Sequence, residues 1–256
     1  MTTAQDILHY IETLAPRDLA MDWDNVGLLC GRANKEVKRI LVALDPFTHV
    51  CEEAVELGAD LLLTHHPLIF TPLSTLTDQS TTGQSIMTLI RHDICAINAH
   101  TNLDCAVGGV NDTLASRLGL HDYQKITEDH EGLLRQGFVP QQALDAFMQQ
   151  VKEALNCPAL RYVSGGKPVS KVAVGGGSCA SALGLVAKAG CDTFVTADIK
   201  YNQFWEAKEL GVNLIDAGHF YTENPVVSVL AEKVGSTFPE IQVFVSQKHA
   251  DCMKFF

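Results

Sequence analysis

Short apolar runs, rich in valine, isoleucine and leucine, recur along the chain without alternating polar positions. The clearest runs span residues 39–44, 60–64, 94–98, 171–174, 193–196 and 212–215. Such runs are typical of strands that are covered on both faces. Between them lie helical patterns over residues 49–57 and 178–189, each followed by a glycine that can end a helix. The alternation predicts right-handed βαβ units and an α/β fold with mainly parallel sheets.

The chain also contains an internal repeat. Residues 39–66 align without a gap on residues 171–198, and both segments carry a Gly-x-Asp sequence before their second strand, at Gly58 and Gly190. We therefore expect two related α/β domains, residues 1–125 and 126–256, with a C-terminal segment that either stays with the second domain or packs back on the first. Within the second domain we expect a strand over residues 132–139, a helix from Pro140 to Leu155, and a strand over residues 161–163.

Composition narrows the class of protein. The chain has 256 residues, of which 46% are hydrophobic, and its 19 basic against 30 acidic side chains give a formal charge of −11. This charge repels phosphate backbones and anionic lipid, so nucleic acid is an unfavourable partner. No apolar run approaches the roughly 18–20 residues of a membrane span, and we expect a cytoplasmic protein. The 8 cysteines show no CxxC pairing, and most are expected to be small buried hydrophobes.

Residues of the types that bind metals follow three of the predicted strands. The pair His65 and His66 follows the second strand, and Pro67 then allows the chain to turn so that both can face one cavity. His100 and Asp104 follow another strand, and the repeat places a similar pair, His219 and Glu223, after a third. Ligands collect at the carboxyl ends of parallel strands. His65, His66, Asp104, His219 and Glu223 supply five nitrogen and oxygen ligands without a thiolate, which favours a pair of divalent ions (Zn, Fe, Mn, Co or Ni).

Several segments together resemble one known family. They are WDNVGLLCG (23–31), LTHHP (63–67), AHTNLD (99–104), GGVND (108–112), AVGGG (173–177) and DAGHFYTE (216–223). In this order, over nearly the whole chain, they resemble the GTP cyclohydrolase 1 type 2 family, also called the NGG-interacting factor three-like proteins and typified by bacterial YbgI. The chain departs from the family pattern at Ala197 and Asn202, where glycine and histidine are usual.

The resemblance implies a dinuclear metal site at the interface of two α/β domains, in subunits that assemble into a hexameric ring. Carried over by position, His65 and Asp104 would bind one ion, His66 and His219 the other, and Glu223 would bridge both. Residues near these ligands are candidates for orienting them, namely Asp45, His100, Asp198 and Asp216. His100 could instead move a proton, so we take it, with Glu223, as a candidate catalytic residue.

Two hypotheses for function follow. The first is a dinuclear metal-dependent hydrolase that uses metal-activated water on a nucleotide or related heterocycle, with ring opening of a purine nucleotide such as GTP implied by the family name. The second is a non-catalytic metal-binding, metal-delivery or scaffold protein. The glycine run before Ser178 is compatible with an anion-binding turn and equally with a tight turn that lets helix and strand pack closely.

Overall fold

The computed structural model describes residues 1–255, which form two compact units. The first unit contains residues Met1–Val107 and Val227–Ala250, and the second contains Gly108–Val226 and the chain from Asp251 onward. These bounds differ from the expected division at residue 125. Residues 108–125 lie in the second unit because β5 (His121–Lys125) pairs with β6 (Arg135–Gln142). Residues 227–250 lie in the first because β11 (Gln242–Val245) pairs with β2 (Arg39–Ala43).

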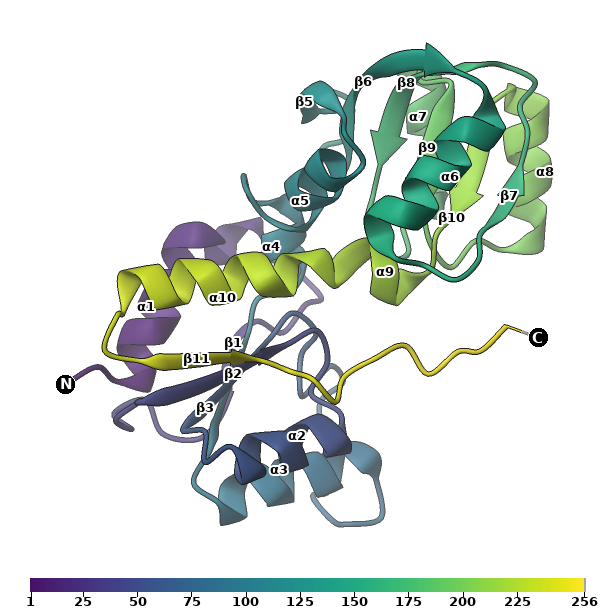
Figure 1. The fold of residues 1–256 in the computed structure, drawn as a ribbon. Coiled ribbons are helices and arrows are strands. Elements are labelled where there is room, and N and C mark those ends of the chain that lie inside the picture. Colours follow the sequence, from purple (N-terminus) through teal and green to yellow (C-terminus); the bar gives the residue numbers. More distant parts are fainter. Residues whose placement is uncertain (256) are drawn as a thin grey trace. The chain divides into compact units, whose positions relative to one another are not determined.

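The first unit is built on a five-stranded sheet in the order β1-β4-β3-β2-β11. Strands β3 (Leu61–Thr64) and β4 (Cys95–Asn98) are fully buried, as their apolar runs predict, and β2, β3, β4 and β11 run parallel. The antiparallel edge strand is β1 (Gly27–Cys30). Helices α2 (Thr48–Glu56) and α3 (Thr81–Arg91) lie on one side of this sheet, and α1 (Ala4–Leu14) and α10 (Pro225–Thr237) lie on the other (Figure 1). Two short helices complete this unit, η1 (Arg17–Leu19) and α4 (Thr101–Cys105).

The second unit contains a six-stranded sheet in the order β5-β6-β8-β9-β10-β7. Its parallel centre is formed by β8 (Val169–Val174), β9 (Thr193–Thr196) and β10 (Asn213–Asp216), while β5, β6 and β7 (Arg161–Val163) pair antiparallel. The expected α/β class is therefore confirmed, with parallel central strands and antiparallel additions. The helices are α5 (Val110–Arg117), α6 (Leu144–Leu155), η2 (Ala180–Ala182), α7 (Leu183–Lys188), α8 (Tyr201–Leu210) and α9 (His219–Glu223).

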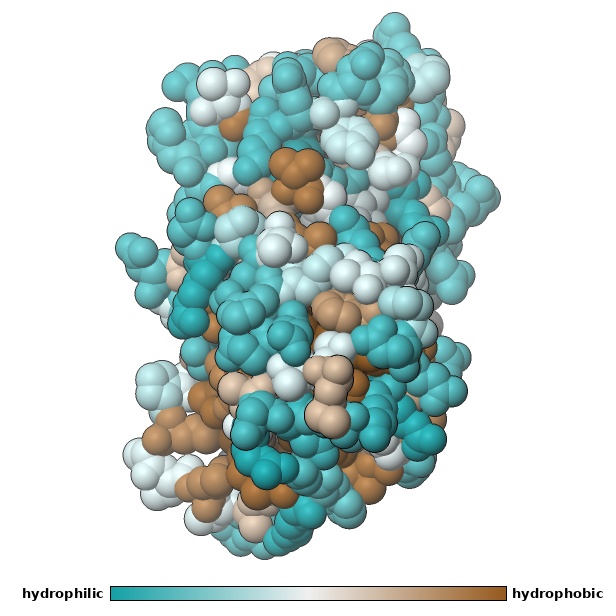
Figure 2. Space-filling view, turned by 90° about the vertical axis from the view of Figure 1, so that its left-hand side faces the viewer, coloured by the Kyte–Doolittle hydropathy of each residue, from teal (hydrophilic) through white to brown (hydrophobic). Residues whose placement is uncertain are grey.

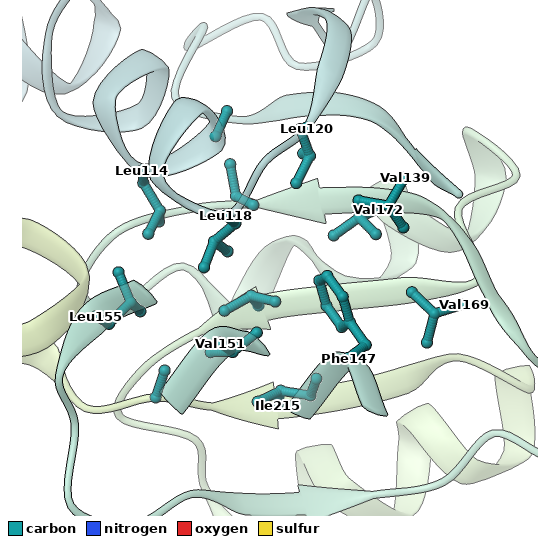
Figure 3. Close-up of a cluster of buried hydrophobic side chains, with 14 of the residues drawn as sticks. Leu114, Leu118, Leu120, Val139, Phe147, Val151, Leu155, Val169, Val172 and Ile215 are labelled. Carbon is teal, nitrogen blue, oxygen red and sulfur yellow. The ribbon is translucent and has the colours of Figure 1, made fainter. Parts of the chain in front are cut away.

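Apolar side chains from α5 and α6 fill the space against the second sheet (Figure 3). Phe147 and Val151 of α6 are fully buried and face Val172 of β8 and Ile215 of β10. Burial of one such side chain contributes about 1.5–3 kcal/mol. On the molecular face drawn in Figure 2, hydrophilic side chains cover most of the surface, and the exposed hydrophobic ones are more frequent in the lower part of the view.

The helix predicted from Pro140 is wrong at its start. Pro140 lies in β6, and α6 begins at Leu144. The strand continues because Val139 is buried between exposed neighbours, an alternation typical of a half-buried strand. The register between β6 and β8 shifts between Phe138 and Gln142, and such an irregularity tolerates a residue without an N–H group.

The internal repeat is present in the structure. Asp60 accepts hydrogen bonds from two successive backbone N–H groups at the start of β2, at 2.8 and 3.1 Å. Asp192 accepts the matching pair near the start of β8, at 3.0 and 2.8 Å. Gly58 and Gly190 both have positive φ, 59° and 75°, where the helix of each repeat ends. The two βαβ units therefore share their local hydrogen bonding as well as their order of elements.

Candidate metal centre

Three imidazoles gather at the carboxyl ends of β3 and β4. His65 and His66 directly follow β3, and His100 follows β4. Their ring centroids lie 4.9 Å (His65 to His66), 5.3 Å (His65 to His100) and 5.5 Å (His66 to His100) apart. One nitrogen from each ring lies within 4.8 Å of those from the other two. Because β3 and β4 are parallel neighbours, their ends meet at one edge of the sheet, which brings these rings together.

The hydrogen bonds of the buried His65 fix which of its nitrogens can bind a metal. Its Nδ1 lies 2.9 Å from the carbonyl oxygen of Ala99. A carbonyl only accepts, so Nδ1 carries the proton and Nε2 is the nitrogen that bears the lone pair. This Nε2 lies 3.6 Å from Oδ1 of Asp104 on α4. The pair therefore offers one nitrogen and one oxygen ligand from a buried position.

His66 is held in the same way by a carboxylate. Its Nδ1 lies 2.6 Å from Oδ1 of Asp45, and Oδ2 of Asp45 lies 2.8 Å from Nε2 of His249. Burial of Asp45 opposes ionisation, but hydrogen bonds from His249 and His66 outweigh it and hold the pKa of this carboxyl well below its usual range. Asp45 therefore remains charged and orients the imidazole of His66. A carboxylate behind a metal-binding histidine is a common arrangement.

His100 is hydrogen-bonded to Asp24, which was not among the candidate residues. Its Nδ1 lies 2.9 Å from Oδ1 of Asp24, and the backbone N–H of Thr101 donates to Oδ2 of Asp24 at 3.0 Å. Burial opposes ionisation of Asp24, yet the hydrogen bonds from His100 and Thr101 lower its pKa to about 2. The available signal was the position of Asp24 in the WDNVGLLCG segment. Trp23 and Phe70 stand edge-on to the His100 ring, at 6.2 and 6.1 Å.

The second unit contributes one histidine and one carboxylate on α9. His219 and Glu223 are four residues apart in this helix, and Nε2 of His219 lies 3.0 Å from Oε2 of Glu223. Nδ1 of His219 lies 2.7 Å from Oδ2 of Asp198, so Asp198 orients His219 as Asp45 orients His66. Glu223 is buried, with 4% of its surface exposed. The expected helical turn after β10 is therefore present.

The glycine run beside this pair is a tight turn. The N–H of Gly176 donates to Oδ1 of Asn111 at 2.7 Å, and that of Gly177 donates to Oγ1 of Thr222 at 3.0 Å. These N–H groups are engaged within the unit, which favours close packing over anion binding. A Cβ added at Gly177 would lie 2.1 Å from Oε1 of Glu223 and 3.0 Å from Nε2 of His219. The absent side chain of Gly177 thus leaves room for both candidate ligands.

Asp216, a candidate for orienting a ligand, contacts no histidine ring in the described hydrogen bonds. It forms an ion pair with Arg161 and accepts hydrogen bonds from the N–H groups of Ile199 and Gly218, so it holds the loops that carry Asp198 and His219. Six cysteines are buried, as expected for small hydrophobes. Burial raises the pKa of Cys51 and Cys191 to about 11, which leaves these thiols protonated and poor metal ligands.

These side chains fit divalent metal ions. In each unit, histidines present Nε2 while an acceptor holds Nδ1, and each unit places a buried carboxylate next to such an imidazole. Nitrogen and oxygen ligands without thiolate suit zinc, manganese, iron, cobalt or nickel. Fold and site together define an α/β protein whose histidine and carboxylate groups could hold a metal ion.

Comparison with known proteins gives the family. The model of the Duf34/NIF3 (NGG1p interacting factor 3) family matches residues 2–252, and the chain belongs to this family. This confirms the resemblance inferred from the sequence segments. Among the described residues, no helix is both long and apolar enough to cross a bilayer.

Relatives cover almost the whole chain. A GTP cyclohydrolase 1 type 2 homolog from Clostridium perfringens is 36% identical over an alignment of 257 positions that covers 98% of each chain. A Bacillus cereus protein related to NIF3 has a TM-score of 0.93 at 24% identity and covers 100% of this chain and 99% of its own, which shows the shared fold. The reduced form of HcgD from Methanocaldococcus jannaschii has a TM-score of 0.84 at 30% identity, covering 96% of this chain and 98% of its own.

Proposed function

We propose that this protein is a dinuclear metal-dependent hydrolase acting on a nucleotide or related heterocycle. The observation that carries the proposal is the shared hydrogen bonding of the histidines. His65, His66 and His219 each have Nδ1 within hydrogen-bond distance of a carbonyl or carboxylate oxygen, an arrangement in which Nδ1 carries the proton and Nε2 bears the lone pair. A neutral imidazole in this tautomer can bind a divalent metal ion through Nε2, and the buried carboxylates of Asp104 and Glu223 lie beside such imidazoles.

The number of ligands supports two ions. His65, His66 and Asp104 come from the first unit, and His219 and Glu223 come from the second. Neither set alone provides ligands for a two-ion centre, and five ligands with one bridging carboxylate suit a pair. In the arrangement that the family resemblance implies, His65 and Asp104 would hold one ion, His66 and His219 would hold the other, and Glu223 would contribute to both. Metal ions held there would supply a Lewis acid and a water molecule of lowered pKa for hydrolysis.

His100 is proposed to move a proton during the reaction. Its Nδ1 is tied to Asp24, which leaves Nε2 to accept a proton from water or to return one to the leaving group. The pKa of Asp24 is about 2, so this carboxylate stays ionised near neutral pH. It therefore stabilises the imidazolium that forms on proton transfer. Trp23 and Phe70 lie beside this ring and are exposed, so they would be able to contact a bound heterocycle.

The substrate class rests on the relatives. Several carry the name GTP cyclohydrolase 1 type 2 homolog, which makes a purine nucleotide the first candidate substrate. The reaction would be hydrolytic opening of the imidazole part of the base. The hexameric ring implied by the family resemblance stays a prediction, which light scattering combined with size-exclusion chromatography tests.

Turnover by protein of defined metal content tests the proposed function. Wild type, His65→Ala and Glu223→Ala are loaded with each candidate metal and assayed on a panel of nucleotides. His92→Ala serves as the control, because His92 is an exposed histidine at the end of α3. We expect turnover that follows metal occupancy in wild type and control and is lost in the other two variants. Full occupancy without turnover on any substrate would reject the hydrolase and favour metal storage or delivery.

A further inference from the structure

The segment that follows β11, residues 246–249, reaches Asp45, the carboxylate that orients the candidate ligand His66. Strand β11 pairs in parallel with β2, with Val245 opposite Val42, so both strands end at the same edge of the sheet. The chain then continues through Ser246, whose N–H donates to the carbonyl of Val42 at 2.9 Å, to His249. Because β2 continues at this edge into Asp45, the pairing brings His249 to the residue that orients His66.

Glu53 of α2 fastens this segment. Its carboxylate accepts hydrogen bonds from the hydroxyl of Ser246 and from the backbone N–H groups of Gln247 and Lys248, the latter two at 2.8 and 3.4 Å. The N–H of His249 in turn donates to the hydroxyl of Ser246 at 3.1 Å. Glu53 is buried, with 5% exposure, so its carboxylate is satisfied by this turn rather than by water.

His249 contacts Asp45 from the side opposite His66. Its Nε2 lies 2.8 Å from Oδ2 of Asp45, while Nδ1 of His66 lies 2.6 Å from Oδ1. The side chain of His249 is 4% exposed, and the ring of Phe47 stands against it at 5.9 Å. One imidazole on each oxygen fixes the plane of the carboxylate. A cavity of about 390 Å³ borders Asp45 and His66, so a carboxylate released on one side has space to turn.

We propose that His249 is a positioning residue for metal binding: it fixes the carboxylate of Asp45, which fixes the imidazole of His66. The inference rests on the proposed metal centre. It extends that centre to His249, which lies outside the sequence segments that pointed to the candidate ligands. Hydrogen-bond partners behind a metal ligand change metal affinity by about 10–100-fold. His249 is one hydrogen bond further from the metal than Asp45, so we expect an effect at the lower end of this range.

The experiment compares His249→Ala, His249→Gln and Lys248→Ala with wild type. A glutamine amide can still donate to Asp45, so His249→Gln tests rescue of the hydrogen bond. Lys248 belongs to the same segment, and its Nζ pairs with Glu56 at 2.6 Å on the surface, so Lys248→Ala tests loosening of the segment alone. Metal affinity is measured by competition with a chromophoric chelator, the geometry by the visible spectrum of the cobalt form, and stability by unfolding of metal-free protein.

We expect His249→Ala to bind one of the two ions about tenfold more weakly with an altered cobalt spectrum, and His249→Gln and Lys248→Ala to match wild type within about threefold. Wild-type affinity and spectrum in His249→Ala would overturn the inference while leaving the proposed function intact. Equal loss of affinity in His249→Ala and His249→Gln, with equal loss of stability, would also overturn it. A wild-type protein that binds no ion would reject the metal centre itself and the inference with it.

Discussion

Replacing Gly177 by alanine tests whether Glu223 is a metal ligand without altering any ligand. The added Cβ would lie 2.1 Å from Oε1 of Glu223, whereas ordinary contacts begin at 3.4 Å. The carboxylate is the end of a flexible side chain, so it must retreat by about 1 Å or more. Metal–ligand distances tolerate only about 0.2 Å, so we expect the displaced Glu223 to be lost as a ligand.

The backbone conformation of Gly177 gives the substitution a second effect, on stability, which must be separated from the displacement of Glu223. Gly177 has a φ of 61°, where a residue with a Cβ costs about 1–2 kcal/mol. Gly190→Ala is the matched control, because Gly190 has a φ of 75° in the same unit and an added Cβ there meets nothing within 4 Å. Both variants should lose about 1–2 kcal/mol of the free energy of unfolding, which lowers the unfolding temperature by a few degrees.

Only Gly177→Ala should lose metal binding. We expect its metal affinity to fall at least about 100-fold, while Gly190→Ala stays within about twofold of wild type. Isothermal titration with zinc or cobalt on metal-free protein measures both affinities, and urea denaturation measures both stabilities. Wild-type metal affinity in Gly177→Ala would refute the assignment of Glu223 as a ligand.

Three further predictions concern charged side chains. The pKa of Asp24 is lowered when folded, so its contribution of about 2 kcal/mol is present above about pH 4 and is lost as the pH falls towards 2. In Asp24→Asn the free energy of unfolding of metal-free protein should therefore fall less steeply as the pH drops from about 4 to 2. The same pH dependence in the variant and in wild type would contradict this. Asp112→Ala should cost about 3–5 kcal/mol because it removes the carboxylate of Asp112 from its ion pair with the buried guanidinium of Arg135, and replacing both residues by apolar ones should cost less in the same urea denaturation. Asp60→Ala and Asp192→Ala should each lower the free energy of unfolding by about 1–3 kcal/mol. A large effect of only one of them would show that the matching hydrogen bonds do not contribute equally in the two repeats.

Much of the fold was predictable because burial leaves a local record. The six apolar runs correspond to β2, β3, β4, β8, β9 and β10 within about two residues at either end. Strands covered on both faces carry no polar positions, so their pattern is visible without neighbours. Pro140 was misread because its start signal for a helix competed with alternating burial in β6. The pairing of β11 with β2 was open because hydrogen bonding between distant strands leaves no local pattern.

The candidate site was predictable to a similar depth. The strand-end positions of these histidines and carboxylates made them candidate ligands, since parallel strands bring their carboxyl ends to one edge. Asp24 and His249 were missed, because each acts on a partner 76 and 204 positions away in the chain. The role of Gly177 was equally hidden, because it depends on the space that a side chain of another element occupies.

By itself, the sequence determined which segments are buried strands, that two βαβ units repeat, and which side chains have metal-binding chemistry, because each of these depends on residue type and spacing. Only the tertiary structure decided the tautomer of each imidazole and the residue that holds it, since these depend on which acceptor lies within hydrogen-bond distance. It also decided that the last strand joins the first unit, because backbone pairing is satisfied by any strand of suitable edge and length.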